Sequence, residues 1–195
     1  MGILEEKKAE KRQRLLDSAW SCFKQKGISQ TSISDICRGA GIAKGTFYLY
    51  FHDREDIAKA LNTRITESLL KESFAYMCSH PADSFAERLI VMADYLMDLF
   101  EKDTDLILII RRDFSWPFRA EEILGGSAKD MIPGYDEIAA YAENSGRPLA
   151  EVLSVIYCLV AMVISVSYDA IIERKPADLP AMRPVLRTII RDCLQ

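Results

Sequence analysis

Side chains that could contact nucleic acid are concentrated between residues 44 and 50. Lys44, Thr46, Tyr48 and Tyr50 alternate there with glycine and apolar residues. A lysine and hydroxyl groups on a short helix are the groups that contact base edges and phosphates when such a helix enters the major groove of DNA. The pattern therefore indicates a segment that binds double-stranded DNA.

Each of these residues also has a simpler interpretation. Tyr48 and Tyr50 could be half-buried aromatic residues, and Lys44 could be a solvated surface charge. Phe47 and Phe51 lie among them and are expected in the core. The choice between the two interpretations depends on the elements that position the segment.

The elements around this segment favour the nucleic-acid hypothesis. Ser32 is expected to cap a helix with Asp35 in capping-box position, and Gly41 is expected to end that helix in a left-handed turn. A short helix from about Lys44 to Phe51 follows. The apolar stripe of the capped helix consists of Ile33, Ile36, Cys37 and Ala40. Two short helices joined by a tight turn form a helix-turn-helix, whose second helix enters the major groove.

The charge distribution supports the same hypothesis. The whole chain has a net charge of −4, which by itself speaks against a non-specific nucleic-acid binder. Residues 1–52 contain nine basic and five acidic side chains, whereas residues 53–195 contain sixteen basic and twenty-four acidic ones. The first part is thus net +4 and the rest net −8, as expected if one end of the molecule approaches a polyanion.

The apolar residues of the whole chain recur at helical spacing, and no segment alternates as a strand would. We expect an all-α protein of about nine helices, with a helix-turn-helix DNA-binding domain at 1–52 and a second helical domain at 53–195. Gly27 is expected to end the first helix, Asp53 to cap a long fourth helix, and Pro81 to open a fifth.

Several other classes of function find no support in the sequence. The uncharged stretch from Val152 to Tyr168 is too short and too interrupted by serine for a membrane span, so we expect a core or dimer helix and no membrane. No signal-peptide segment, P-loop, G-x-S-x-G or paired-carboxylate motif is found, which predicts a cytoplasmic chain without catalysis or cofactor. The five cysteines are irregularly spaced, and His52 and His80 lack the spacing of metal ligands, so we expect no metal site.

The run from Thr31 to Ile57 resembles the DNA-binding domain of the tetracycline-repressor (TetR) family of bacterial transcription regulators. The resemblance rests on Thr31-Ser32-Ile33, Asp35-Ile36, the segment AGIAKGTFYLYF at 40–51, and Arg54-Glu55-Asp56-Ile57. Two positions depart from the family pattern. Ala43 stands where the family often has serine, and Cys37 where it often has alanine, so a capping hydroxyl is lost and the packing is kept.

The resemblance implies DNA contacts that can be carried over position by position. Phosphate contacts are expected from Thr31 or Ser32, and from Tyr48, Tyr50, His52 and Arg54. Base contacts are expected from Lys44, Gly45, Thr46 and Leu49. The implied partner is a palindromic operator in double-stranded DNA, and the implied activity is that of a ligand-responsive regulator, most simply a repressor.

The resemblance further implies a small-molecule effector bound within helices four to seven. Candidates for the effector site combine a large apolar area with a polar tip. They are Tyr95, Arg111, Trp116, Tyr135 and Tyr157. Ordinary core packing is the alternative for each of them. The aromatic and methionine content of residues 76–157 predicts a largely apolar or aromatic effector.

A homodimer formed by the last two helices is also implied. These helices carry more apolar residues than one buried face per helix requires. The expected interface residues are Val152, Val155, Ile156, Leu159, Val163, Val166, Val185, Leu186 and Ile189. The competing hypotheses are a helical small-molecule-binding protein that does not bind an operator, and an enzyme in the helical body. The basic charge of residues 1–52 argues against the first, and the lack of catalytic motifs argues against the second.

Overall fold

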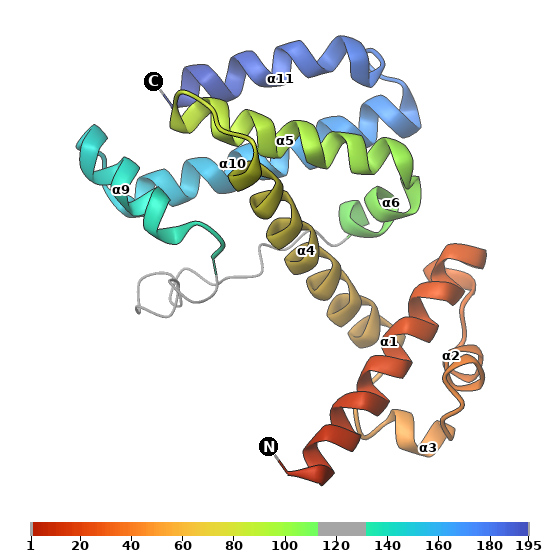
Figure 1. The fold of residues 1–195 in the computed structure, drawn as a ribbon. Helices are drawn as coiled ribbons and strands as arrows, with labels where there is room; N and C mark the ends of the chain where they lie inside the picture. Colours follow the sequence, from red (N-terminus) through yellow and green to blue (C-terminus); the bar gives the residue numbers. More distant parts are fainter. Residues whose placement is uncertain (1, 113–131, 195) are drawn as a thin grey trace. The chain divides into compact units, whose positions relative to one another are not determined.

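The fold was analysed in a computed structural model, which describes residues 2–112 and 132–194. Within these ranges the chain forms nine α-helices and one π-helical turn, and no strand (Figure 1). The expected all-α class is therefore confirmed. The chain divides into two compact units, Met1–Arg64 and Ile65–Gln195. This geometric boundary lies inside one helix, and the functional boundary between residues 52 and 53 stays a prediction.

The first unit contains three helices and the start of a fourth. They are α1 (Ile3–Gln30), α2 (Ile33–Ala40), α3 (Lys44–Phe47) and the first part of α4 (Arg54–Ser79). Gly27 ends the regular part of α1 as expected: its φ of 76° and ψ of 161° are non-helical, and one further helical turn follows up to Gln30. Asp53 caps α4 as expected, because its carboxylate accepts a hydrogen bond from the backbone N–H of Asp56 at 2.8 Å.

The core of the first unit is supplied by every element within it. Leu15, Leu16 and Ala19 of α1 are at most 1% exposed. Further fully buried residues come from the other elements, namely Ile36, Phe47, Ile57 and Leu61. Burying apolar area of this kind contributes about 25 cal/mol per Å². The helix-turn-helix is therefore fixed to α1 and α4 by its apolar side, which leaves its polar side outward.

The second unit is built from the remainder of α4 and six further elements. These are α5 (Phe85–Lys102), α6 (Thr104–Arg112), α9 (Tyr135–Ser145), α10 (Leu149–Tyr168), the π-helical turn η1 (Asp169–Glu173) and α11 (Leu179–Cys193). The start of α5 was predicted at Pro81, but the helix begins at Phe85. Ser84 accepts a hydrogen bond from the backbone N–H of Glu87 and so provides the cap.

Helix α10 is the most apolar element of the second unit. It packs against α5, α6, α9 and α11. With η1 it is one helix, among those described, that is long and apolar enough to cross a membrane by length and composition, and a third of its most apolar window is buried. A helix that is apolar on nearly all sides needs further protein to bury the sides that its own unit leaves exposed. Without such a partner, those apolar side chains stay in contact with water.

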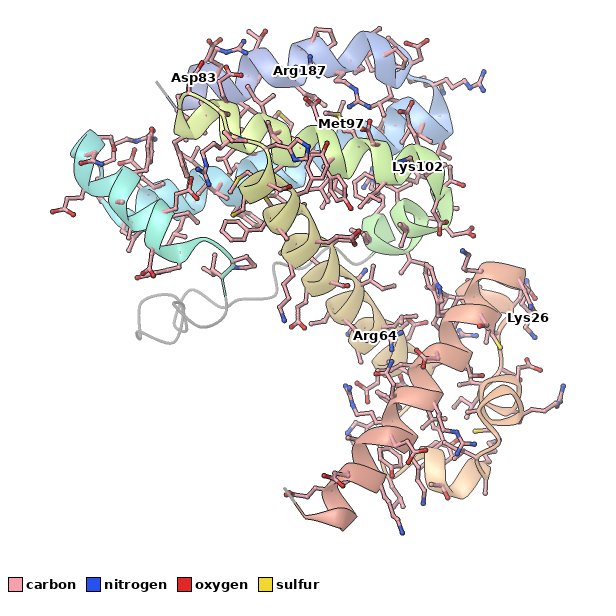
Figure 2. All side chains as sticks on the ribbon, in the orientation of Figure 1. Lys26, Arg64, Asp83, Met97, Lys102 and Arg187 are labelled. Carbon is pink, nitrogen blue, oxygen red and sulfur yellow. The ribbon has the colours of Figure 1, made fainter. Side chains whose placement is uncertain are left out.

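Helices α5 and α11 lie side by side and are joined by ion pairs (Figure 2, where Arg187 is labelled on α11). Arg187 Nη2 lies 2.7 Å from Oδ2 of Asp94, and Arg191 Nε lies 2.7 Å from Oε1 of Glu87. Arg183 contacts Asp94 as well, and its Nη2 is 2.7 Å from Asp98. The three arginines recur every four residues and therefore lie on one face of α11.

Candidate functional site

The geometry of the helix-turn-helix is set by its caps. Ser32 Oγ accepts from the backbone N–H of Asp35 at 3.1 Å, and Oδ2 of Asp35 accepts from the backbone N–H of Ser32 at 3.0 Å. Gly41 ends α2 with φ 63° and ψ 38°, as expected for a left-handed C-cap. These two predictions are confirmed. The turn after Gly41 delivers the chain to Lys44, where α3 begins.

The segment after this turn is shorter as a helix than predicted. It is α-helical only over Lys44–Phe47, although a helix to Phe51 was expected. The chain then tightens, because the N–H groups of Leu49 and Tyr50 donate to carbonyls three residues back, at 3.1 and 2.9 Å. The N–H of Phe51 returns to the four-residue spacing by donating to Phe47 at 3.0 Å. We call residues 44–50 the recognition segment.

The recognition segment is amphipathic. Phe47 is completely buried and Phe51 is 3% exposed, whereas Tyr48 is 50% exposed and Leu49 is 75% exposed. Of the other predicted contact residues, Lys44 and Gly45 are exposed and Thr46 and Tyr50 are half-buried. Leu49 and Tyr48 together expose apolar area to water next to Lys44, which is unfavourable for a domain without a partner. The arrangement suits base edges, thymine methyl groups and phosphates.

Thr31, Ser32 and Arg54, three of the residues predicted to contact phosphates, differ in exposure and in their hydrogen bonds. Thr31 is 1% exposed, and its hydroxyl donates to the carbonyl of Gly27 at 2.8 Å. Of the alternatives Thr31 or Ser32, only Ser32 is therefore at the surface. Arg54 does not point freely outward: its Nη1 donates to the carbonyls of Ser29 at 2.8 Å and Thr31 at 3.3 Å. Its guanidinium also closes the end of α1, and its side chain is 36% exposed, so the expected phosphate contact from Arg54 stays a prediction.

The remaining predicted contact, His52, is exposed next to the recognition segment. Its backbone N–H donates to Oδ2 of Asp56 at 2.9 Å, and the imidazole ring takes no part in this hydrogen bond. In the described ranges no group of three or more His, Cys, Asp or Glu side chains is arranged to hold a metal ion.

The second unit contains an apolar pocket. It encloses about 500 Å³ of empty space, including the part that opens to solvent. Its walls come from α4, α5, α9 and α10, and include Leu70, Phe74, Met77, Leu89, Ile138 and Val160. A second pocket of about 400 Å³ shares Leu89, Met92, Ile156 and Val160 with the first. A mainly apolar lining of this kind is typical of sites for small ligands.

One polar pair lies at the wall of the larger pocket. Glu137 lines it, and Arg88 Nε lies 2.6 Å from Oε1 of Glu137, with Nη2 donating to Oε2 at 2.9 Å. Each side chain of the pair is about 30% exposed. The other described residues that line this pocket are apolar or glycine.

The structure does not bring the predicted effector residues together at this pocket. Tyr95 donates to Oε1 of Glu72 at 2.5 Å, and this hydrogen bond raises the pKa of Tyr95 to about 12. Arg111 lies 4.9 Å from the ring centroid of Tyr168 and pairs with Asp169. Neither residue lines either apolar pocket.

The other three predicted effector residues are also placed elsewhere. Tyr135 is half-buried against the apolar cluster around α9. Tyr157 is 41% exposed on α10. Trp116 lies outside the described residues. The pocket is instead lined by residues such as Leu70, Phe74 and Met77, which the sequence analysis missed. These three residues lie in the second half of α4, at positions that continue the helical spacing of its apolar residues. Only that spacing could have indicated them.

The predicted dimer residues fall into two groups. Five are already buried within a single chain, namely Val152, Ile156, Leu159, Val163 and Leu186. Val155 and Val166 are partly buried against the same core. Val185 and Ile189 remain 47% and 37% exposed. Because buried side chains offer little surface to a partner, a dimer interface on these helices has to rest on the exposed group.

Comparisons with known proteins match this description. Residues 15–61 match the family model of the bacterial regulatory proteins of the tetR family. The uncharacterized HTH-type transcriptional regulator YvdT of Bacillus subtilis is 33% identical over 101 residues, which are 51% of this chain and 50% of the relative. The HTH-type transcriptional regulator AcrR of Shigella flexneri is 31% identical over 47% of this chain and 41% of its own. The chain spans about half the length of the curated relatives that it matches.

A solved structure extends the similarity to the whole fold. The transcriptional regulator FadR from Bacillus subtilis, solved in complex with stearoyl-CoA, has a TM-score of 0.60 over 91% of this chain and 96% of its own, at 18% identity. Identity this low bears on the fold alone. The matched family and relatives are transcriptional regulators rather than enzymes.

Proposed function

The chain belongs to the TetR family of bacterial transcriptional regulators, and from this premise we propose that it is a ligand-responsive repressor. In this proposal the first unit binds a palindromic operator in cytoplasmic DNA. The second unit forms a homodimer and takes up a small, largely apolar effector that weakens operator binding. The observation that carries the proposal is the recognition segment, in which Phe47 is buried while Lys44, Tyr48 and Leu49 are exposed.

Within the recognition segment we assign different roles to different side chains. Lys44 and Thr46 are near the start of α3 and are assigned to base edges, together with Gly45 and Leu49. Tyr48, Tyr50, His52 and Ser32 are assigned to phosphates. Phosphate contacts fix position without reading sequence, whereas contacts to base edges set sequence preference.

The dimer is proposed on α10 and α11. The exposed side chains Tyr157, Val185 and Ile189 on these helices support it, because isolated apolar surface of this kind marks interaction sites. A two-fold dimer would present two recognition segments to successive major grooves, about 34–36 Å apart on one face of the duplex.

The effector is proposed to bind the larger apolar pocket. Its lining of leucine, isoleucine, phenylalanine and methionine supports a mainly apolar ligand. The Arg88–Glu137 pair provides one polar end at the wall. A ligand that weakens operator binding must bind the two conformations of the regulator with different affinity, and operator DNA must then weaken ligand binding by the same factor.

The deciding experiment is selection of duplexes from a random-sequence library by the purified chain, followed by gel-shift titration. Lys44→Ala and Thr46→Ala are expected to change the preferred sequence, whereas Tyr48→Phe is expected to weaken all duplexes alike. Lys71→Ala, an exposed lysine on the part of α4 in the second unit, is the control. Failure of the wild-type chain to enrich any sequence would contradict the proposal.

A further inference from the structure

Between Glu5 and Arg14, α1 buries no side chain within the first unit. Every described side chain from Glu5 to Arg14 is exposed, and the first buried residue of the helix is Leu15. A helical segment without a buried face gains no stability from tertiary packing. Its exposed surface is therefore available to a partner, and its charges indicate which kind.

The charges of this segment are separated onto two faces. At 3.6 residues per turn, Lys7, Lys11 and Arg14 share one side, and Lys8 and Arg12 extend it. The opposite side carries Glu6, Glu10, Gln13 and Asp17. Glu5 lies at the edge of the basic side next to Arg12, and Glu10 lies three residues after Lys7 and four before Arg14, so acidic groups flank this side. Five cations outnumber these acidic groups, and we call the side of α1 that carries the five cations the basic face.

The basic face lies on the side of α1 that packs against the helix-turn-helix. Leu15, four residues after Lys11, is completely buried. The guanidinium of Arg12 lies 5.3 Å from the ring centroid of Phe51, directly after the recognition segment. Arg14 donates through Nη2 to the carbonyl of Ala40 at the end of α2. Figure 1 shows the same relation within the first unit, with the beginning of α1 beside α3.

These two arginines are engaged within the first unit, and the lysines extend past them. Lys7, Lys8 and Lys11 precede Arg12 by one to five residues, which is at most about 7.5 Å along the helix. That length corresponds to roughly two base-pair steps of 3.4 Å along a duplex.

We infer that Lys7, Lys8 and Lys11 form a second DNA-binding surface, which contacts backbone phosphates flanking the bases read by the recognition segment. This inference rests on the proposed function, because it requires that the recognition segment occupies a major groove. The partner is identified by charge complementarity: a helix face with five cations beside a nucleic-acid-binding segment fits a phosphate backbone. The surface adds affinity without adding sequence information.

The test compares two triple variants of equal net charge. In one, Lys7→Gln, Lys8→Gln and Lys11→Gln remove the basic face, and glutamine keeps the helix propensity of lysine. In the control, Lys71→Gln, Lys102→Gln and Lys175→Gln remove three exposed lysines of the second unit (Lys102 is labelled in Figure 2). Binding is measured by fluorescence anisotropy over a series of salt concentrations. The probes are a duplex selected by the wild-type chain and a duplex of unrelated sequence.

The first triple variant is expected to bind both duplexes about tenfold or more weakly at low salt. The slope of log K against log salt should become shallower by about 0.9 for each phosphate that the variant no longer neutralises. Replacing the same three lysines by arginine should restore both quantities, and circular dichroism should give the same melting curve for all variants. Affinity and slope equal to those of the control would overturn the inference while leaving the proposed function intact. A wild-type chain that binds neither duplex would overturn both.

Discussion

Lys26, near the end of α1, places its Nζ 2.6 Å from Oδ2 of Asp35, the residue that completes the cap of α2 (Figure 2 labels Lys26). The same carboxylate accepts from the backbone N–H and the hydroxyl of Ser32 at 3.0 and 2.7 Å. Three donors thus converge on one carboxyl group, and its charged form is favoured by all of them. The hydrogen bond from Lys26 is the largest cause that holds the pKa of Asp35 well below its ordinary value of 3.8.

The first prediction concerns acid stability. A folded-state pKa below the unfolded value means that the unfolded chain binds more protons, so stability rises with pH in this window. The contribution of Asp35 is complete above pH 3.8 and is lost as pH falls through its folded-state pKa. Asp35→Asn should therefore be less stable than wild type at pH 7, and the difference should shrink below about pH 4.

Urea unfolding at a series of pH values measures this difference. Lys26→Gln is the matched variant: it keeps the cap and removes the strongest donor, so the folded-state pKa of Asp35 should rise toward 3.8 and less stability should be lost as pH falls below 3.8 than in wild type. A stability difference between wild type and Asp35→Asn that is the same at pH 7 and pH 3 would contradict the assignment.

The second prediction separates a glycine needed for binding from one needed for folding. A Cβ added at Gly45 would meet no atom within 4 Å, so nothing in the described structure requires glycine there. We expect Gly45→Ala to leave the free energy of unfolding unchanged, or to raise it by up to about 1 kcal/mol through helix propensity. DNA affinity should fall, because the added methyl group occupies the surface assigned to a base edge.

Gly41→Ala is the matched folding variant. Gly41 has φ +63°, and a Cβ would lie 2.9 Å from Nη2 of Arg14. Left-handed backbone costs a residue with a Cβ about 1–2 kcal/mol. Chemical denaturation should show this loss for Gly41→Ala and not for Gly45→Ala. Full DNA affinity in Gly45→Ala would remove Gly45 from the proposed interface.

The third prediction concerns the dimer. Val185→Glu with Ile189→Glu places two charges on exposed positions of α11, so folded monomers are expected in sedimentation velocity. Val163→Glu tests a different property, because Val163 is 2% exposed inside one chain. It should cost several kcal/mol of protomer stability through an unpaired buried carboxylate. An unchanged dimer in the double variant would place the interface elsewhere.

The fourth prediction concerns the apolar pocket. Met92 and Val160 line both pockets, so Met92→Trp or Val160→Phe should fill the space. Binding of Nile red, a neutral apolar dye, should weaken about tenfold in either variant, or about 1.4 kcal/mol. Tyr95→Phe is the control because Tyr95 bonds to Glu72 away from both pockets. Equal weakening by Tyr95→Phe in a fluorescence titration would return Tyr95 to the effector site.

The helix-turn-helix could be predicted from sequence because its signals are local. The Ser32–Asp35 capping box and the Gly41 turn each act within a few residues, and the structure has both. Asp53 as the cap of α4 follows the same logic. Pro81 misled because a proline tolerated at a helix start is not itself a cap, and Ser84 supplied the hydrogen bond.

The roles that sequence reasoning missed depend on contacts between distant residues. Arg54 bonds to the carbonyl of Ser29, twenty-five residues earlier, and nothing in the local pattern indicates that pairing. The pocket arises where α4, α5, α9 and α10 meet, whereas periodicity indicates only which face of each helix is apolar. Val163 and Val185 are equally apolar in sequence, and only packing decides that the first is buried and the second exposed.

The arginines of α11 have a consequence for self-association. Arg183, Arg187 and Arg191 turn toward the carboxylates of α5, on a different side of the helix from Val185 and Ile189. In the proposed two-fold dimer the same surface of both subunits meets, so a cation left on the outer side near the axis would lie close to an identical cation. By directing its positive charge to α5, α11 keeps that outer side free of these three arginines and removes a source of repulsion between like subunits.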